Sequence, residues 1–338
     1  MRGRAARSRS RSSGVVLLLT LVVLAVLAIV AGRYVERMDR ARERVVGLQQ
    51  MADATARAQA TQAALAYWVA TRALRNAGHG EAGLELKEDG RWYRSADSTV
   101  FFSVRDHRGL LPANSLEREE LLRVFAPFGL QGPRADTLVD VLQDYLDTDD
   151  LKRLNGAERR EYEALGKPPP RNDWLVSVQE MAQLPHWQDE PALLSELPEI
   201  FSPSTLRLFN PLTASVPVLR ARLPGMTDEQ LQRLLTLRAE SVLVDGPTAA
   251  RFTGLALDRD DFIFAPGPEK RILVWAPGLP RMHEYNVRFS TGGVLGPWLV
   301  TEFSFAPRRL IRNDLPTFPL PGLAGRPEQV VAARPAAP

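Results

Sequence analysis

A cluster of carboxylates near the middle of the chain is the clearest candidate for chemistry. Acids occupy three of the four positions from 147 to 150, and Glu158 is the twelfth residue counted from Asp147. An EF-hand loop takes oxygen ligands at positions 1, 3 and 5, glycine at 6 and glutamate at 12. Leucine and lysine stand at positions 5 and 6, so no EF-hand closes here. Two interpretations stay open: a simpler calcium site made by Asp147, Asp149 and Glu158, or acids that cap and solvate helix ends.

Signatures of catalysis are missing from the sequence. It has no cysteine, which excludes thiolate metal sites, thiol nucleophiles and disulfides. It also lacks the zinc-protease, serine-hydrolase, P-loop and dinucleotide motifs. Asp106 and His107 are adjacent, and we interpret them as residues of a surface turn. We therefore expect no enzymatic activity and, apart from the calcium considered above, no cofactor.

A basic leader and an apolar run open the chain. Residues 1–14 carry five arginines and no acid, and Val15–Ala31 contain Thr20 as their only polar residue. At 1.5 Å per residue this run spans roughly 26 Å, close to the thickness of a bilayer's hydrocarbon core. The basic start should stay in the cytoplasm, which places the chain after Arg33 across the membrane. From Arg33 to about Asn76 there is no proline and apolar residues recur at helical spacing, so one long helix is expected.

The net charge of +3 comes from this leader. Without its five arginines the chain carries 38 basic and 40 acidic groups, a net charge of −2. General binding to nucleic acid or another polyanion is therefore disfavoured.

Three alternatives describe the fate of the apolar run. It can be a single-pass anchor, or the core of a signal peptide that is cut after Ala28 or Gly32 and releases a secreted hydrolase. It can also stay on the mature protein, if the cut falls between Gly14 and Val15 as in a type IV pilin-like leader. Glycine suits such a cut because it lets a protease approach the backbone closely.

Apolar patterns predict an α+β fold in which one small antiparallel sheet is interrupted by a large all-α insertion. Strands are predicted at 91–94 and 99–105, then a helical block of about 130 residues, then strands at 271–276, 284–291 and 298–305. Seven prolines after residue 306 predict a disordered tail. The expected segments are a leader (1–14), the N-terminal helix (15–77), the first part of the sheet (78–110), the α-helical insertion (111–265), the second part of the sheet (266–306) and the tail (307–338).

Capping patterns locate two helix starts in the insertion. Asn114 with Glu117 predicts a helix that continues to residue 125, and Ser177 with Glu180 predicts another. Val176 and Met181 stand at the positions of a hydrophobic staple for the second one.

Residues 219–238 resemble a helix-hairpin-helix unit of the SAM-like type, with Leu223-Pro224-Gly225 in the hairpin. Such hairpins often bind nucleic-acid phosphates through backbone N–H groups. Here Pro224 removes one donor, and Asp228 and Glu229 place negative charge where a phosphate would bind. Packing of the two helices is favoured, and a membrane-anchored DNA-binding protein is the alternative function.

Considered together, these features resemble the K-type minor pseudopilins of type II secretion systems, the general secretion pathway protein K family. The similarity extends from about residue 10 to 305. Beyond the leader and the long helix, it rests on the following segments in order: 103–109 with Asn114, the aspartate-rich 142–162 with Asn155-Gly156-Ala157-Glu158, Pro170-Arg171-Asn172 with 177–180, 209–214 with Leu223-Pro224-Gly225, and His283-Glu284-Tyr285.

The resemblance implies a non-enzymatic role in an inner-membrane, single-pass protein whose bulk lies in the periplasm. Prepilin peptidase would cut after Gly14, and the new amine of Val15 would be methylated. The long helix would pack with the I-type and J-type minor pseudopilins, with no nucleic acid involved. The bulky insertion would sit at the pseudopilus tip, where the complex supports export of folded proteins across the outer membrane. Some family members bind calcium, which bears on the acids described above.

Leu19 is the residue that the resemblance connects with the tip. In pilins, a glutamate at this fifth mature position pairs with the free amine of the subunit above and so offsets the cost of a charge in the membrane. A subunit at the tip has no neighbour above it, and an acid there would be buried without a partner. An apolar residue at this position therefore fits a capping subunit.

Overall fold

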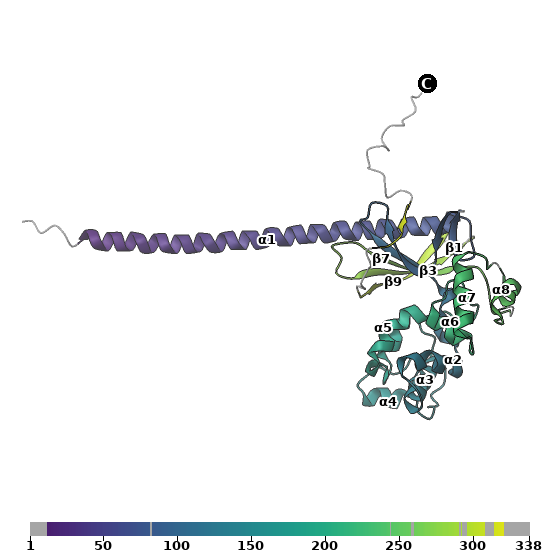
Figure 1. Cartoon of the computed structure of the whole chain (residues 1–338). Coiled ribbons are helices and arrows are strands. Elements are labelled where there is room, and N and C mark those ends of the chain that lie inside the picture. The colour runs from purple at the N-terminus through teal and green to yellow at the C-terminus, as the bar shows by residue number, and fades with distance from the viewer. Residues whose placement is uncertain are drawn as a thin grey trace, which may run out of the picture. The chain divides into compact units, whose positions relative to one another are not determined.

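The computed structural model describes residues 12–81, 83–243, 245–257, 260–290, 292, 296–307 and 314–320. The chain divides into two units, residues 1–56 and 57–338. Most of the predicted leader, residues 1–11, and the last part of the predicted tail, residues 321–338, lie outside the described residues. The fold is α+β, with one long helix, a small sheet and a helical insertion (Figure 1).

The long helix α1 runs from Ser12 to Thr71. Its sequence contains no proline and many alanines, which favour helix over its whole length. The helix ends before the expected boundary at residue 77, because the chain reverses direction after Thr71. Leu74 forms a β-bridge with His79, and the backbone N–H of Arg75 donates to the carbonyl of Gly78.

The main sheet has six strands in the order β10-β3-β4-β7-β8-β9. Their bounds are β3 (Asp89–Ser95), β4 (Phe101–Asp106), β7 (Glu269–Trp275), β8 (Met282–Phe289), β9 (Trp298–Ala306) and β10 (Thr317–Phe318). All neighbours are antiparallel except β10, which runs parallel to β3. The five predicted strands are confirmed. β4 and β7 are adjacent although the whole insertion separates them in the sequence, so the sheet is interrupted as expected.

A β-hairpin occupies the start of the segment 78–110, which was predicted to be the first part of the sheet. It consists of β1 (Gly78–Glu81) and β2 (Leu84–Lys87), and Leu86 is fully buried. A Cβ atom on Gly78 would lie 1.8 Å from the carbonyl oxygen of Leu86, so this glycine allows a close approach between the strands. The glycine at this position therefore serves strand pairing.

The prediction of a disordered tail is wrong for residues 314–320. β10 adds to the outer edge of β3, and the backbone N–H of Arg94 donates to the carbonyl of Pro316. Phe318 is 3% exposed and contacts the rings of Trp68 and Tyr93 edge-on. Proline is compatible with an edge strand. The buried side chain of Phe318 packs this segment against the sheet and α1, and the proline-rich composition gave no sign of that packing.

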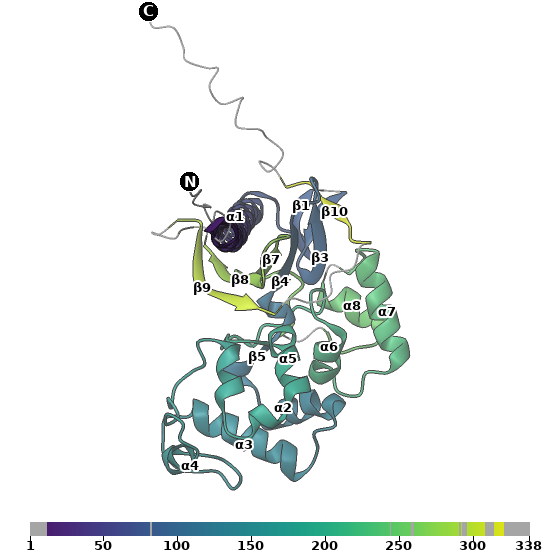
Figure 2. The same ribbon diagram turned by 90° about the vertical axis from the view of Figure 1, so that its left-hand side faces the viewer.

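The insertion contains seven α-helices among the described residues, linked by short 3₁₀ turns. The helices are α2 (Arg118–Phe125), α3 (Pro133–Leu146), α4 (Arg159–Ala164), α5 (Pro191–Ile200), α6 (Val216–Arg222), α7 (Asp228–Ala239) and α8 (Gly246–Thr253). The 3₁₀ turns are η1 (His107–Gly109), η2 (Ala113–Ser115), η3 (Ala126–Phe128), η4 (Val178–Gln183) and η5 (Trp187–Asp189), and two short strands, β5 (Leu111–Pro112) and β6 (Phe201–Ser202), pair with each other. At the centre of the core the ring of Trp187 contacts Phe125 edge-on and donates to the carbonyl of Leu138. Within residues 57–338, Figure 2 shows these helices grouped on one side of the sheet.

Two of the predicted caps differ in detail from the structure. Glu117 rather than Asn114 caps α2, because the Asn114 amide donates to the carbonyls of Leu175 and Pro203 instead. The capping box of Ser177 and Glu180 is confirmed, although the element it starts is the 3₁₀ turn η4. The predicted staple is wrong, because the side chain of Val176 is exposed.

Candidate functional site

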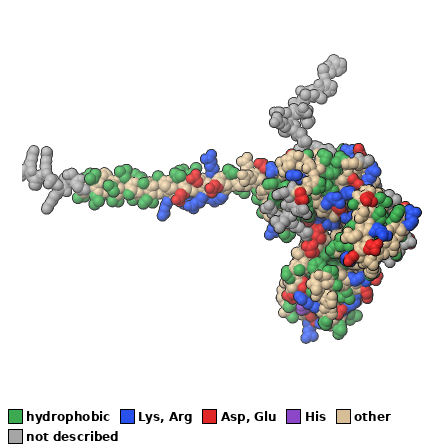
Figure 3. Space-filling model, in the orientation of Figure 1, with side chains coloured by type: hydrophobic (Ala, Val, Ile, Leu, Met, Phe, Trp, Pro, Cys, Tyr) green, Lys and Arg blue, Asp and Glu red, His purple; other side chains and the backbone are tan. Residues whose placement is uncertain are grey.

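The first part of α1 is an apolar surface. Val15 to Val30 expose most of their large hydrophobic side chains, Leu19 among them at 63%. Figure 3 shows hydrophobic side chains around the helix here, followed by charged ones further along. This helix is the one described element that is long and apolar enough to cross a membrane. Gly14 and Val15 both lie within its first turns, so the backbone is helical across the predicted cleavage site.

The acid cluster lies in the loop between α3 and α4, and only part of the predicted set comes together. Asp147 accepts a hydrogen bond from Arg153 Nη1 at 2.5 Å, and Asp144, on the last turns of α3, accepts one from the same atom at 2.7 Å. Asp149 lies on the exposed side of the loop, where it accepts from the backbone N–H of Leu151. Arg153 is therefore the cation that holds this turn together.

Glu158 is the buried member of the acid cluster that forms no ion pair with an arginine or lysine among the described residues. Its side chain is largely buried, with the residue 5% exposed. Apart from the capping box that it forms with Glu161 at the start of α4, neither carboxylate oxygen has a hydrogen-bond partner among the described residues. Burial, together with a smaller contribution from repulsion by Asp144 and Asp147, raises the pKa of Glu158 to about 7. Burial also raises the pKa of Asp144, although Arg153 opposes this. The cluster thus has more carboxylates than positive charges.

These acids do not form a ready calcium site. Among the described residues, no group of three or more acids or histidines is arranged to hold a metal ion. Asp149 is exposed, and Arg153 pairs with both Asp144 and Asp147. Asp144 belongs to the aspartate-rich segment 142–162 but was not among the predicted calcium ligands. Gly156 gives a signal for its place, because a Cβ atom there would lie 1.8 Å from Asp144 Oδ2. Glycine is required where this carboxylate meets the loop.

Glu158→Gln should stabilise the protein in a pH-dependent way. The folded carboxyl keeps its proton up to about pH 7, whereas the unfolded one loses it near pH 4.5. Wild type therefore loses stability relative to the variant as the pH rises between these values, by roughly 2–3 kcal/mol in total. Urea unfolding of the full chain in detergent at pH 5 and pH 8 measures this. The gain should be large at pH 8 and small at pH 5.

The control is Asp149→Asn, whose exposed side chain should make little difference at either pH. An equal effect of Glu158→Gln at both pH values would contradict the burial argument. Calcium added at pH 8 separates the two interpretations of the acids. If calcium raises the stability of wild type and Glu158→Gln abolishes this rise, Glu158 is a calcium ligand. If calcium causes no rise, the acids cap and solvate helix ends.

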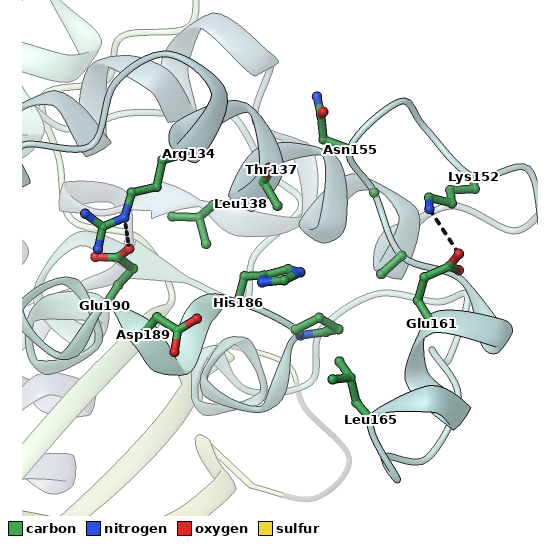
Figure 4. A pocket seen from close by; sticks show the side chains of 13 residues that line it. Arg134, Thr137, Leu138, Lys152, Asn155, Glu161, Leu165, His186, Asp189 and Glu190 are labelled. Atoms are coloured by element: carbon green, nitrogen blue, oxygen red, sulfur yellow. Dashed lines mark hydrogen bonds and ion pairs between the residues drawn. The ribbon is translucent and has the colours of Figure 1, made fainter.

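A polar pocket of about 430 Å³ lies beside this loop. Its charged side chains already form pairs: Arg134 with Glu190 at 2.5 Å and Lys152 with Glu161 at 3.0 Å, as drawn in Figure 4. His186 projects between them. The charges of these two pairs neutralise one another, whereas Asp189, a further acid of the lining, forms no ion pair among the described residues.

The helix-hairpin-helix segment is formed by α6 and α7. Leu223, Met226 and Leu231 are buried, so the hairpin packs into the insertion. At the start of α7, Asp228 pairs with Arg220, and Glu229 pairs with Arg233 at 3.0 Å. The protein's own carboxylates therefore occupy the place of a phosphate, and the geometry agrees with packing of the two helices.

Asp106 lies where the chain leaves the main sheet for the insertion, next to the place where it returns. It is the last residue of β4 and stands opposite Lys270 in β7, and both are fully buried. Lys270 Nζ also pairs with Glu88, which His79 contacts at 2.5 Å. Interpreting Asp106 as a surface residue was therefore wrong. Its oxygens accept hydrogen bonds from the backbone N–H of Gly267 and from the side chains of the insertion residues Asn210 and Thr213.

A second ionic contact fixes the insertion to the sheet. Arg105 and Arg271 stand opposite each other in β4 and β7, and both reach Glu199 near the end of α5. The Arg105–Glu199 distance is 2.6 Å. Without Glu199, two buried guanidinium groups would face each other, with Asp89 as the remaining acid that acts on Arg105.

Comparison with known proteins gives one family match. Residues 102–195 match the family model "Type II secretion system (T2SS), protein K". No curated protein matches the chain. A chain in the crystal structure of the GspK-GspI-GspJ complex from the enterotoxigenic Escherichia coli type 2 secretion system is 16% identical, with coverage of 80% of this chain and 97% of that chain and a TM-score of 0.47. Over residues 102–195, from β4 into α5, the chain is thus similar to protein K of type II secretion systems, in agreement with the family resemblance drawn from the sequence.

Proposed function

We propose that this protein is a minor pseudopilin of a type II secretion system, with a structural rather than enzymatic role. The observation that carries the proposal is the protein K match at residues 102–195, in a chain that begins with a long apolar helix and inserts a helical domain between β4 and β7. In this proposal α1 anchors the chain in the inner membrane, and the sheet and insertion lie in the periplasm.

The proposed partners are the I-type and J-type minor pseudopilins, which would pack against α1. The insertion would then cap the pseudopilus tip, because such a wide domain cannot be packed inside a filament. Leu19 supports this position, since an acid buried in the membrane without a partner is costly. At the tip, the complex would support export of folded proteins across the outer membrane.

Mass spectrometry of the mature N-terminus tests the proposal directly. Cleavage by prepilin peptidase predicts a chain that begins with a methylated Val15. A start after Ala28 or Gly32 would instead identify an ordinary signal peptide and overturn the proposal. A chain that keeps Met1 would indicate that the apolar run is a simple single-pass anchor, and it would likewise contradict pseudopilin processing.

Gly14→Ala should block maturation. A side chain at this position obstructs the close approach that the peptidase needs, so the variant should accumulate as a precursor that retains the 14-residue leader. Gel mobility and intact mass of the membrane fraction measure this. Ala28→Leu is the matched control, because it alters the alternative signal-peptidase site and should leave processing unchanged. Normal processing of Gly14→Ala would place the cut elsewhere.

A further inference from the structure

The edge strand β9 exposes two phenylalanines on one of its faces. Its outer edge has no strand partner among the residues that the structure describes. Its register with β8 places Phe303 opposite Tyr285 and Phe305 opposite His283. Register partners point to the same face of a sheet, so each phenylalanine continues a row of side chains that crosses several strands.

Following these rows across the sheet shows which face they share. The row of Phe305 continues through His283 and Val274 to Phe102 on β4. Phe102 lies in the ring cluster with Phe318, which contacts Trp68 of α1. β9 therefore presents its phenylalanines on the face that packs against α1, and the insertion lies on the opposite face with Arg105 and Arg271.

Burial falls sharply at the end of these rows. Phe102 and Val274 are fully buried and His283 is 5% exposed, whereas Phe303 is 49% and Phe305 53% exposed. Val300 on the same face is 40% exposed. The two phenylalanine rings lie 5.0 Å apart and form one apolar strip. An apolar core row thus continues to the surface and stays uncovered.

The opposite edge of the sheet is covered, unlike the edge at β9. There β10 covers β3, and Phe318 is only 3% exposed. On the other face of β9, Glu302 accepts a hydrogen bond from Asn286 at 2.6 Å, and Leu299 is the exposed apolar residue there, at 46%. The two exposed phenylalanines therefore lie together on one face of one edge, which is typical of an interaction surface.

We propose that the strip of Val300, Phe303 and Phe305 is the docking surface for an apolar α-helix of a sister minor pseudopilin, an inference that rests on the proposed function. The strip continues the face that already packs a helix, where Leu65 and Trp68 of α1 are buried. From Val300 to Phe305 the strand rises about 16 Å, or roughly three helical turns. No charged side chain lies in the strip, so its partner must be apolar too.

A helix fits this surface better than an added strand. The pairing of β8 and β9 shifts register between Asn286 and Val287, which places a bulge at Thr301. A bulge twists an edge and interrupts its ladder of backbone donors and acceptors, so strand addition is disfavoured. The side chains of the strip are unaffected by it and remain free for face-to-face packing.

The test compares Phe303→Ser/Phe305→Ser with Leu151→Ser/Leu154→Ser. The control pair removes equally apolar side chains that are 77% and 91% exposed in the insertion. The full chain, co-expressed with the I-type and J-type pseudopilins and purified in detergent, should lose at least tenfold in partner recovery with the first variant. The control should bind like wild type. Equal recovery with the two variants would overturn the proposal.

A second measurement keeps the aromatic ring and identifies the occupant. A photo-reactive benzoylphenylalanine at position 305 should cross-link to the N-terminal helix of a sister subunit. A cross-link to a second copy of this chain, or to a strand of the partner, would overturn the assigned occupant. If wild type itself recovers no sister subunit, the proposed function fails. If wild type recovers them and the strip variant does too, only this surface fails.

Discussion

Replacing Glu199 with glutamine should lower the free energy of unfolding by about 3–5 kcal/mol, the usual cost of removing one partner from a buried ion pair. Arg105 and Arg271 are 6% and 5% exposed and face each other across β4 and β7. Burial lowers the pKa of the Arg105 guanidinium, and Glu199 is the main group that opposes this. Arg105 donates to Glu199 through Nη2. Its Nε and Nη1 atoms have no hydrogen-bond partner among the described residues.

Urea unfolding of the full chain in detergent measures the effect, and limited proteolysis should show easier cleavage within the insertion. Glu196→Gln is the matched control, because it lies on the same helix and forms no ion pair among the described residues. It should change stability by less than about 0.5 kcal/mol. A loss below about 1 kcal/mol for Glu199→Gln would mean that solvent or a rearranged side chain compensates the arginines.

A double-mutant cycle separates the ion pair from general packing. Glu199→Leu alone should be strongly destabilising, whereas Glu199→Leu combined with Arg271→Leu should recover part of the loss, because one of the two facing charges is then gone. Additive losses in the double variant would contradict the proposed role of charge.

The contact of Glu199 with the two arginines could not be predicted from the sequence. Glu199 lies 94 residues from Arg105 and 72 from Arg271, and no local pattern connects them. By contrast, the strands β4 and β7 follow from apolar runs, and the capping box of Ser177 and Glu180 spans three residues. Local hydrogen bonds and periodic burial leave a signal in the sequence. Long-range ion pairs do not.

The errors have the same origin. Asn114 has the right spacing for a cap, but its amide bonds to two loops of the insertion that come close only in the folded protein. In the acid cluster, the spacing of Asp147 and Glu158 correctly pointed to neighbours, but it could not reveal that Arg153 would pair with both Asp144 and Asp147. The proline content of the tail predicted disorder, and tertiary packing of Phe318 overrides it.

Lys270→Met should be as damaging as the loss of Glu199, for the opposite reason. Lys270 is fully buried and pairs with both Glu88 and Asp106, which are also fully buried. Methionine matches the aliphatic stem but leaves these carboxylates without their cation, which should cost about 3–5 kcal/mol. Chemical unfolding of the full chain measures the loss. Lys87→Met, at a partly exposed position of β2, is the control and should change stability by less than about 0.5 kcal/mol.

A second substitution decides whether charge is responsible. Glu88→Gln combined with Lys270→Met removes one negative charge together with the positive one, so the double variant should be more stable than Lys270→Met alone. If the two losses simply add, the buried network acts only through its packing. Because Asp106 and Lys270 stand where the insertion leaves and re-enters the sheet, loosening this pair should also free the insertion. If a firmly held insertion is needed at the pseudopilus tip, Lys270→Met should reduce secretion even in cells where the protein is still matured and inserted.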